Sequence, residues 1–143
     1  MLGNFQESQL RVSVDVNEGT IGNSLLKTKN LRKWIIPQTL SSELPEILEA
    51  GIVFTSWLGF VSIHHHVEIA NKNSLRLILS QGIDGYHEWV WGDGWVQSRL
   101  EGISLLPLKL GQTFDLLKLR QFVITKEQVK LNRKESWLGY NEK

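Results

Sequence analysis

Between residues 51 and 106 the chain consists of five strand-like runs that follow one another with no helical pattern between them. They read GIVFTSWL, FVSIHHHVEIAN, SLRLILSQGI, YHEWVWGD and GWVQSRLEGISLL, with glycine or asparagine between successive runs. Asp93-Gly94, between two tryptophan-rich runs, is typical of a tight hairpin. Parallel strands need long crossover connections, and no segment here provides one, so the pattern predicts an antiparallel meander.

One more strand is predicted near the N-terminus. In residues 5–17, FQESQLRVSVDVN, leucine and valine alternate with polar side chains at the period of a half-buried strand. Asn17, Gly19 and Gly22 then indicate a turn.

A first helix is predicted over residues 24–36, where leucines and tryptophan recur at helical spacing among basic residues. Ser24 is the expected N-cap, and Pro37 ends the helix at or before the preceding residue. Residues 39–49 fit either a helical turn or an irregular connection, because Pro45 interrupts a mixed pattern.

A second helix is predicted over residues 113–123, with Thr113 as its N-cap. The β-branched run at residues 123–125 lowers the helix propensity beyond that point. Residues 126–143 are expected to form a charged tail, disordered in part. The domain itself is expected to span residues 1–125.

Composition sets the broad class. A chain of 143 residues with 41% hydrophobic and 22% charged residues can bury one sizeable core. The net charge of +1 does not favour nucleic acid, and no apolar run is long enough to span a membrane. The absence of cysteine excludes disulfides and cysteine-based metal sites and fits a reducing compartment. With no signal-peptide pattern, a cytoplasmic location is expected, while the oligomeric state stays open.

The six tryptophans are numerous enough to fill a core or to line a cavity. Strand alternation places His87, Trp89 and Trp91 on one face, which predicts an aromatic wall. On the next strand, Trp95 and Arg99 share a face with a glutamate. Either this face is a solvated strip, or Arg99 reaches into a pocket to bind an anion.

Three consecutive histidines are the most conspicuous local motif. On a strand, His64 and His66 share the polar face, whereas His65 lies among valine and isoleucine. A zinc site needs at least one further ligand, for which Glu68, His87 and Glu88 are the candidates, and no metal site is predicted from this partial set. His65 is either a core histidine or one that faces a cavity, where it can orient a ligand or act as an acid or base.

Familiar catalytic and cofactor motifs are missing from the sequence. It contains no GxSxG, no Walker A loop, no GxGxxG after a strand and no HExxH. No catalytic residue and no cofactor are therefore predicted.

The order of elements resembles the helix-grip layout of the START and polyketide-cyclase superfamily (SRPBCC). The resemblance is carried by the strand at residues 10–16, the helical segment ending at Trp34, and the run WVWGDGWVQSRLEGISLLPL leading into GQTFDLLKLR. It implies an α+β fold in which a curved antiparallel sheet wraps around a C-terminal helix, with short helices after the first strand. In that family an apolar cavity lies between the sheet and the last helix.

Three functions follow as hypotheses. The favoured one is a module that binds a hydrophobic or amphipathic small molecule between sheet and helix. The alternatives are a cyclase, dehydratase or hydrolase that uses a cavity histidine, and a protein-interaction module. The residues expected to contact the ligand are His65, His87, Trp89, Trp91, Trp95, Arg99, Phe114 and Leu117.

Overall fold

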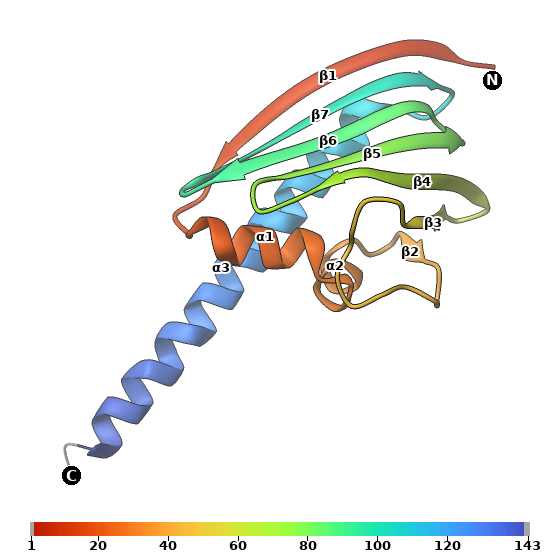
Figure 1. Cartoon of the computed structure of the whole chain (residues 1–143). Coiled ribbons are helices and arrows are strands. Elements are labelled where there is room, and N and C mark those ends of the chain that lie inside the picture. The colour runs from red at the N-terminus through yellow and green to blue at the C-terminus, as the bar shows by residue number, and fades with distance from the viewer. Residues whose placement is uncertain (1, 142–143) are drawn as a thin grey trace.

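Antiparallel strands form a seven-stranded sheet in the order β1-β7-β6-β5-β4-β3-β2. The coordinates are a computed structural model that describes residues 2–141, with side chains to residue 136. The sheet curves over α3, and α1 and α2 lie against the same side (Figure 1). The elements are β1 (Asn4–Ser13), α1 (Glu18–Leu26), α2 (Thr28–Trp34), β2 (Thr39–Leu40), β3 (Val53–Leu58), β4 (Val61–Ala70), β5 (Ser74–Gln81), β6 (Asp84–Gly92), β7 (Trp95–Ser104) and α3 (Leu108–Asn141).

The predicted meander is confirmed. From β3 to β7 each strand pairs antiparallel with the next. β1 pairs along its whole length with β7, and the short β2 pairs with β3 at the other edge. The fold class is therefore the predicted one, an α+β helix-grip layout with a long C-terminal helix and short helices after the first strand.

Two glycines face each other where β6 meets β7, as the pair Gly85 and Gly102. A Cβ at Gly85 would lie 1.9 Å from the carbonyl oxygen of Glu101, and one at Gly102 would lie 2.7 Å from that of Asp84. No side chain fits at that distance, and glycine inside a strand is typical of such close backbone approach. The pair therefore permits the backbones of β6 and β7 to approach closely here.

The first helix begins earlier than predicted. The side-chain oxygen of Asn17 accepts a hydrogen bond from the backbone N–H of Thr20 at 2.9 Å, so Asn17 is the N-cap of α1. Both glycines predicted to form a turn lie inside α1, and a Cβ on Gly22 would come within 3.1 Å of the indole nitrogen of Trp91. Ser24 is not an N-cap: it is buried inside the helix, where its hydroxyl donates to the carbonyl of Thr20.

The predicted helix is also divided in two. Lys27 is extended, with φ −80° and ψ 115°, and separates α1 from α2. α2 ends at Trp34, before Pro37, as predicted. Residues 39–49 contain no helix; they hold β2 and an isolated bridge between Lys27 and Ile47, which agrees with the irregular alternative.

α3 is much longer than the helix predicted over residues 113–123. It begins at Leu108, whose backbone N–H donates to the side-chain oxygen of Gln6 at 3.1 Å. Thr113 therefore lies inside the helix rather than at its N-cap, and its hydroxyl donates to the carbonyl of Lys109. The tail is predicted over residues 126–143; the helix continues through residue 141, and residues 142 and 143 lie outside the described residues.

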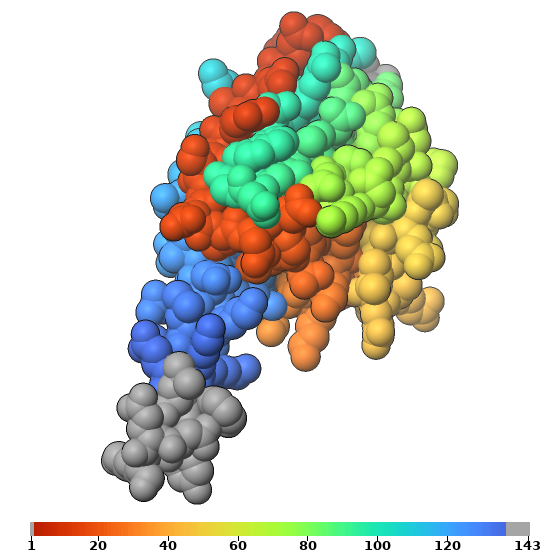
Figure 2. Space-filling view, turned by 60° about the vertical axis from the view of Figure 1, so that its left-hand side comes forward, coloured from red at the N-terminus to blue at the C-terminus, as the bar shows by residue number. Residues whose placement is uncertain are grey.

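The β-branched run does not end α3 because packing outweighs propensity there. Val123 belongs to the buried stripe of the helix, with Leu108, Gln112, Leu116 and Leu119. From residue 128 to residue 136 the helix is exposed, and this part projects beyond the body of the molecule (Figure 2). Among residues 2–141, no helix carries an apolar stretch sufficient to cross a membrane.

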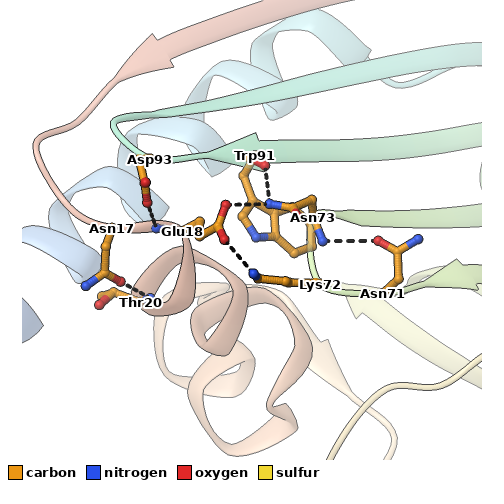
Figure 3. Close-up of polar contacts among 8 residues, drawn as sticks. All are labelled: Asn17, Glu18, Thr20, Asn71, Lys72, Asn73, Trp91 and Asp93. Atoms are coloured by element: carbon orange, nitrogen blue, oxygen red, sulfur yellow. Dashed lines mark hydrogen bonds and ion pairs between the residues drawn. The ribbon is translucent and has the colours of Figure 1, made fainter.

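A polar network fastens the start of α1 to the turns at one end of the sheet (Figure 3). The Glu18 carboxylate accepts a hydrogen bond from Asn73 at 2.9 Å and lies 3.0 Å from the Lys72 ammonium. The backbone N–H of Glu18 donates to Asp93 at 2.8 Å, and Asn73 also donates to the carbonyl of Trp91. The hydrogen bond from Asn73, with Lys72, lowers the pKa of Glu18. This network fixes how α1 meets β6.

Candidate functional site

A cavity of about 530 Å³ lies between the inner face of the sheet, α3 and the α2 region. Leucine, isoleucine and aromatic side chains make up most of its wall, and β5 contributes Leu75, Leu77 and Leu79. A cavity of this size with a mainly apolar wall is typical of small-molecule sites. The polar and charged residues in the wall are Gln38, His65, His87, Gln112, Asp115 and Lys118.

His65, on β4, is held in the wall by Ser56 and Phe54. Its Nε2 lies 2.8 Å from the hydroxyl of Ser56 on β3, and the Gln38 amide donates to the same hydroxyl oxygen at 2.6 Å. Phe54 stacks on the imidazole, with ring centroids 4.6 Å apart and planes 5° from parallel. The Nδ1 atom of His65 is buried and has no hydrogen-bond partner among the described residues.

His87, on β6, is supported in the same way from the other side of β5. Its Nε2 lies 2.7 Å from the hydroxyl of Ser98 on β7. Gln112 of α3 donates to that hydroxyl oxygen at 3.0 Å, and its own side-chain oxygen is buried without a partner among the described residues. The Trp89 ring lies beside the imidazole, with centroids 4.7 Å apart. Each histidine is thus backed by one serine and one glutamine.

Both imidazoles are neutral at neutral pH. Burial, and then the proximity of His64, lowers the pKa of His65 to about 4. Burial, and then the proximity of His65, lowers the pKa of His87 to about 3. Each Nε2 shares one hydrogen bond with its serine hydroxyl, and which of the two atoms donates depends on the tautomer of the ring.

The two serines support the histidines and do not act as nucleophiles. Ser56 and Ser98 are both 0% exposed, and neither lines the cavity. A nucleophilic hydroxyl must reach the carbon that it attacks, in addition to its hydrogen bond with a base. The serine–histidine pairs therefore orient the rings, and they argue against a serine hydrolase.

Charged groups at the cavity neutralise one another where α3 meets the end of α2. The Lys118 ammonium donates to the carbonyl oxygens of Ile35 at 3.2 Å and Ile36 at 3.0 Å. It also lies 3.3 Å from the Asp115 carboxylate. Burial raises the pKa of Asp115, and Lys118 opposes this shift. Lys118 thus joins α3 to the segment after α2 instead of offering an unpaired cation to a ligand.

Half of the predicted ligand contacts line the cavity, namely His65, His87, Trp89 and Phe114. Trp91 lies on the predicted face of β6, but it packs beside Gly22 of α1 and is 1% exposed. Leu117 is 53% exposed and points away from the buried stripe of α3. Alternation along β6 was therefore predicted correctly, while α1 covers the end of the strand that carries Trp91.

Trp95 and Arg99 lie on the outer face of the sheet. β7 buries the alternate residues, so the set containing these two points away from the cavity. The guanidinium of Arg11 lies 4.2 Å from the centroid of the Trp95 ring, and Arg99 lies 3.8 Å from the Glu101 carboxylate. Of the two alternatives for this face, the structure shows the solvated strip, and Arg99 does not enter the cavity.

The outer histidines do not complete a metal centre in the described part of the chain. His66 is exposed and His64 half-buried, on the face of β4 opposite His65. Glu68 lies 3.7 Å from Arg76 in an ion pair. No cluster of three or more histidine, aspartate or glutamate side chains that could hold a metal occurs among the residues described.

Sequence reasoning missed the residues that hold the two histidines in place. Ser56 and Ser98 each lie on the inward-facing set of an apolar strand, and a buried hydroxyl there indicates that a polar partner is close. Gln38 lies 18 residues from its serine and Gln112 lies 14 residues from its own, each on a different element. No local pattern connects them.

Comparisons by sequence find no matching protein-family model and no matching curated protein. Comparisons by structure find the same fold. A protein of Chromobacterium violaceum superposes with a TM-score of 0.67 at 15% identity, covering 82% of this chain and 96% of that one. Ara h 8.0201 superposes with a TM-score of 0.61 at 11% identity, covering 85% of this chain and 99% of that one.

A third similar structure is DynU16, a protein of the dynemicin biosynthetic locus, with a TM-score of 0.62 at 14% identity. The match covers 84% of this chain and 48% of DynU16, so this chain corresponds to about half of that protein. At such low identities the likeness shows the fold alone. Together with the sheet topology, it shows that the chain has a helix-grip fold.

Proposed function

We propose that the protein binds a hydrophobic or amphipathic small molecule in the cavity between the sheet and α3. The observation that carries this proposal is the cavity itself, which has a volume of about 530 Å³ and a mainly apolar wall. Removing an apolar wall and an apolar ligand from water is favourable, so an apolar molecule is the favoured occupant of the cavity.

The rim of the cavity supports a route for the ligand from solvent. Leu58, Leu110 and Phe114 line the cavity and are also 44%, 54% and 56% exposed. Leu58 comes from β3, and Leu110 and Phe114 come from α3. An apolar molecule can therefore contact apolar side chains before it leaves water.

The fold gives further support. A curved sheet over a helix leaves room for a ligand, and DynU16, which shares the fold, belongs to a biosynthetic locus. On this basis we propose that the chain belongs to the START and polyketide-cyclase superfamily. Folds of this kind carry several functions, so the proposal rests on the cavity rather than on the likeness.

A thermal-shift screen against lipids, isoprenoids and aromatic polyketides tests the proposal. The matched variants are Leu77→Trp, which narrows the cavity, and Ile78→Trp on the outer face of the same strand. A ligand should raise the Tm of the wild type and of Ile78→Trp equally, and that of Leu77→Trp less, because stabilisation falls as Kd rises. Equal shifts in all three proteins, or no shift with any compound, would contradict the proposal.

A further inference from the structure

We propose that a second pocket, between α1, α2 and α3, binds a phosphate group through its lysines. This pocket has a volume of about 220 Å³, and among the described residues it has no wall residue in common with the apolar cavity. It lies where α3 passes beside α1 and α2 (Figure 1). The site does not depend on the proposed function, because the two pockets are separate.

The wall of this pocket consists of polar and charged residues, in contrast to the mainly apolar cavity. Three of them are lysines: Lys27 from the link between α1 and α2, and Lys126 and Lys130 from α3. Lys126 and Lys130 are one helical turn apart, so their side chains leave α3 on the same side. Each ammonium is carried by a flexible four-carbon stem, so the three can converge on one anion. Thr20 and Asn23 of α1 add a hydroxyl and an amide to the wall.

Lys126 is the lysine that the structure holds in place. Its Nζ donates to the side-chain oxygen of Asn30 at 2.8 Å. Asn30 is itself fixed, because it is 7% exposed and its amide donates to the carbonyl of Asn23 at 3.1 Å. An ammonium has three N–H donors, and Asn30 is the one hydrogen-bond acceptor of Lys126 among the described residues. The remaining donors are therefore left for a ligand.

The positive charge at this pocket is not compensated by nearby carboxylates. Among the described residues, none of the three wall lysines forms an ion pair. Burial, and then the proximity of Lys33, Lys27 and Lys29, lowers the pKa of Lys126, and no acidic group opposes this shift. Like charges held together cost free energy, which a bound anion recovers.

Glu127 is the acidic residue in the wall, and it offsets only part of this charge. Three positive charges against one negative charge leave the wall with a net charge of +2. A phosphate monoester carries a charge of about −1.5 to −2 at pH 7 and three strong acceptor oxygens, which match several N–H donors. The pocket is smaller than the usual site for a drug-sized molecule, which fits a compact group of this kind.

Titration with inorganic phosphate, followed by ¹H–¹⁵N NMR, tests the proposal. The ionic strength is held constant with sodium chloride, so that a shift reflects binding and not screening. The side-chain amide signals of Asn23 and Asn30 should move and saturate, because both residues line the pocket. The backbone signals of Leu75, Leu77 and Leu79, which line the apolar cavity, should stay in place.

The variants assign the binding to the pocket lysines. Lys126→Met and Lys130→Met should each weaken phosphate binding about tenfold, as expected for the loss of one charge-assisted contact. Glu127→Gln should strengthen binding, because it removes the negative charge from the wall. Lys109→Met is the matched control: it removes an exposed lysine of α3 outside this pocket and should change the Kd less than about twofold.

A phosphate group can reach the pocket on a soluble compound or on a lipid. Cosedimentation with phosphatidylcholine vesicles, with and without phosphatidic acid, separates these sources. Saturation by inorganic phosphate without vesicle binding supports a soluble phosphate compound. Cosedimentation that requires phosphatidic acid and that Lys126→Met abolishes supports a lipid headgroup.

Three results would overturn the proposal. The first is the absence of both a saturable shift at the two asparagines and a dependence on phosphatidic acid. The second is equal phosphate affinity in the wild type and in Lys126→Met/Lys130→Met. The third is an equal loss of affinity in Lys109→Met, which would assign the effect to the net charge of the protein. None of them changes the proposed function, since the apolar cavity is a separate site.

Discussion

Lowering the pH from 7 to 5 should destabilise the protein through His65 and His87. In the folded protein their pKa values are about 4 and about 3, whereas a histidine in an unfolded chain has a pKa of about 6.5. Between these values the unfolded state binds protons that the folded state does not. The free energy of unfolding therefore falls as the pH falls through this window.

The size of the effect follows from the same shifts. At pH 5 the unfolded form of each histidine is almost fully protonated, which removes about 2 kcal/mol per residue relative to pH 7. Asp115 acts in the opposite direction, because burial raises its pKa and the folded state then binds its proton more tightly. We expect a net loss of about 2 to 4 kcal/mol.

Urea unfolding at both pH values, followed by tryptophan fluorescence, measures this loss. The variants His65→Asn and His87→Asn should each remove about half of the pH effect, and the double variant most of it. Val96→Ala is the control: it shortens a buried side chain of β7 and should cost about 2 kcal/mol at both pH values. If the double variant loses as much stability as the wild type between pH 7 and pH 5, the histidines are not the cause.

Further predictions concern backbone and capping positions, each checked by urea unfolding. Gly85→Ala should cost about 3 kcal/mol or more, because its Cβ would lie 1.9 Å from a backbone oxygen. Gly111→Ala should stabilise by up to about 1 kcal/mol, because nothing lies within 4 Å of the added Cβ in α3. A Gly85→Ala variant more stable than Gly111→Ala would contradict the packing described. Asn17→Ala should cost about 1 kcal/mol by removing the cap of α1, whereas Asn132→Ala, on the exposed part of α3, should change stability by less than about 0.5 kcal/mol.

The sheet could be predicted from the sequence because the patterns that indicate its strands are local. Alternation along each run and the glycines between runs give both the strands and their order. The helices were harder, since their boundaries depend on distant contacts. Ser24 has the chemistry of an N-cap, yet α1 begins at Asn17 and buries Ser24 against the rest of the fold. Val123 has a low helix propensity, yet its burial in the core keeps α3 helical.

The site could be predicted only in part, for a related reason. Alternation tells which face a side chain takes, and it placed His65, His87 and Trp89 inward. It does not tell which element covers each end of a strand, so Trp91 was assigned to the cavity although α1 packs over it. The serine and glutamine partners come from separate elements, and their contacts exist only in the folded chain. The tautomer of the two histidines therefore depends on tertiary structure.

The position of β5 between the two supported histidines has a consequence for how such a protein can diverge. Leu75, Leu77 and Leu79 shape the middle of the cavity, and they take no part in the hydrogen bonds that hold the imidazoles. Their sizes can change by single substitutions while the polar frame on β4 and β6 stays in place. The shape of the cavity can thus change while the serine contacts of the two histidines stay the same, so under the proposed function β5 is the strand where substitutions should alter the choice of ligand.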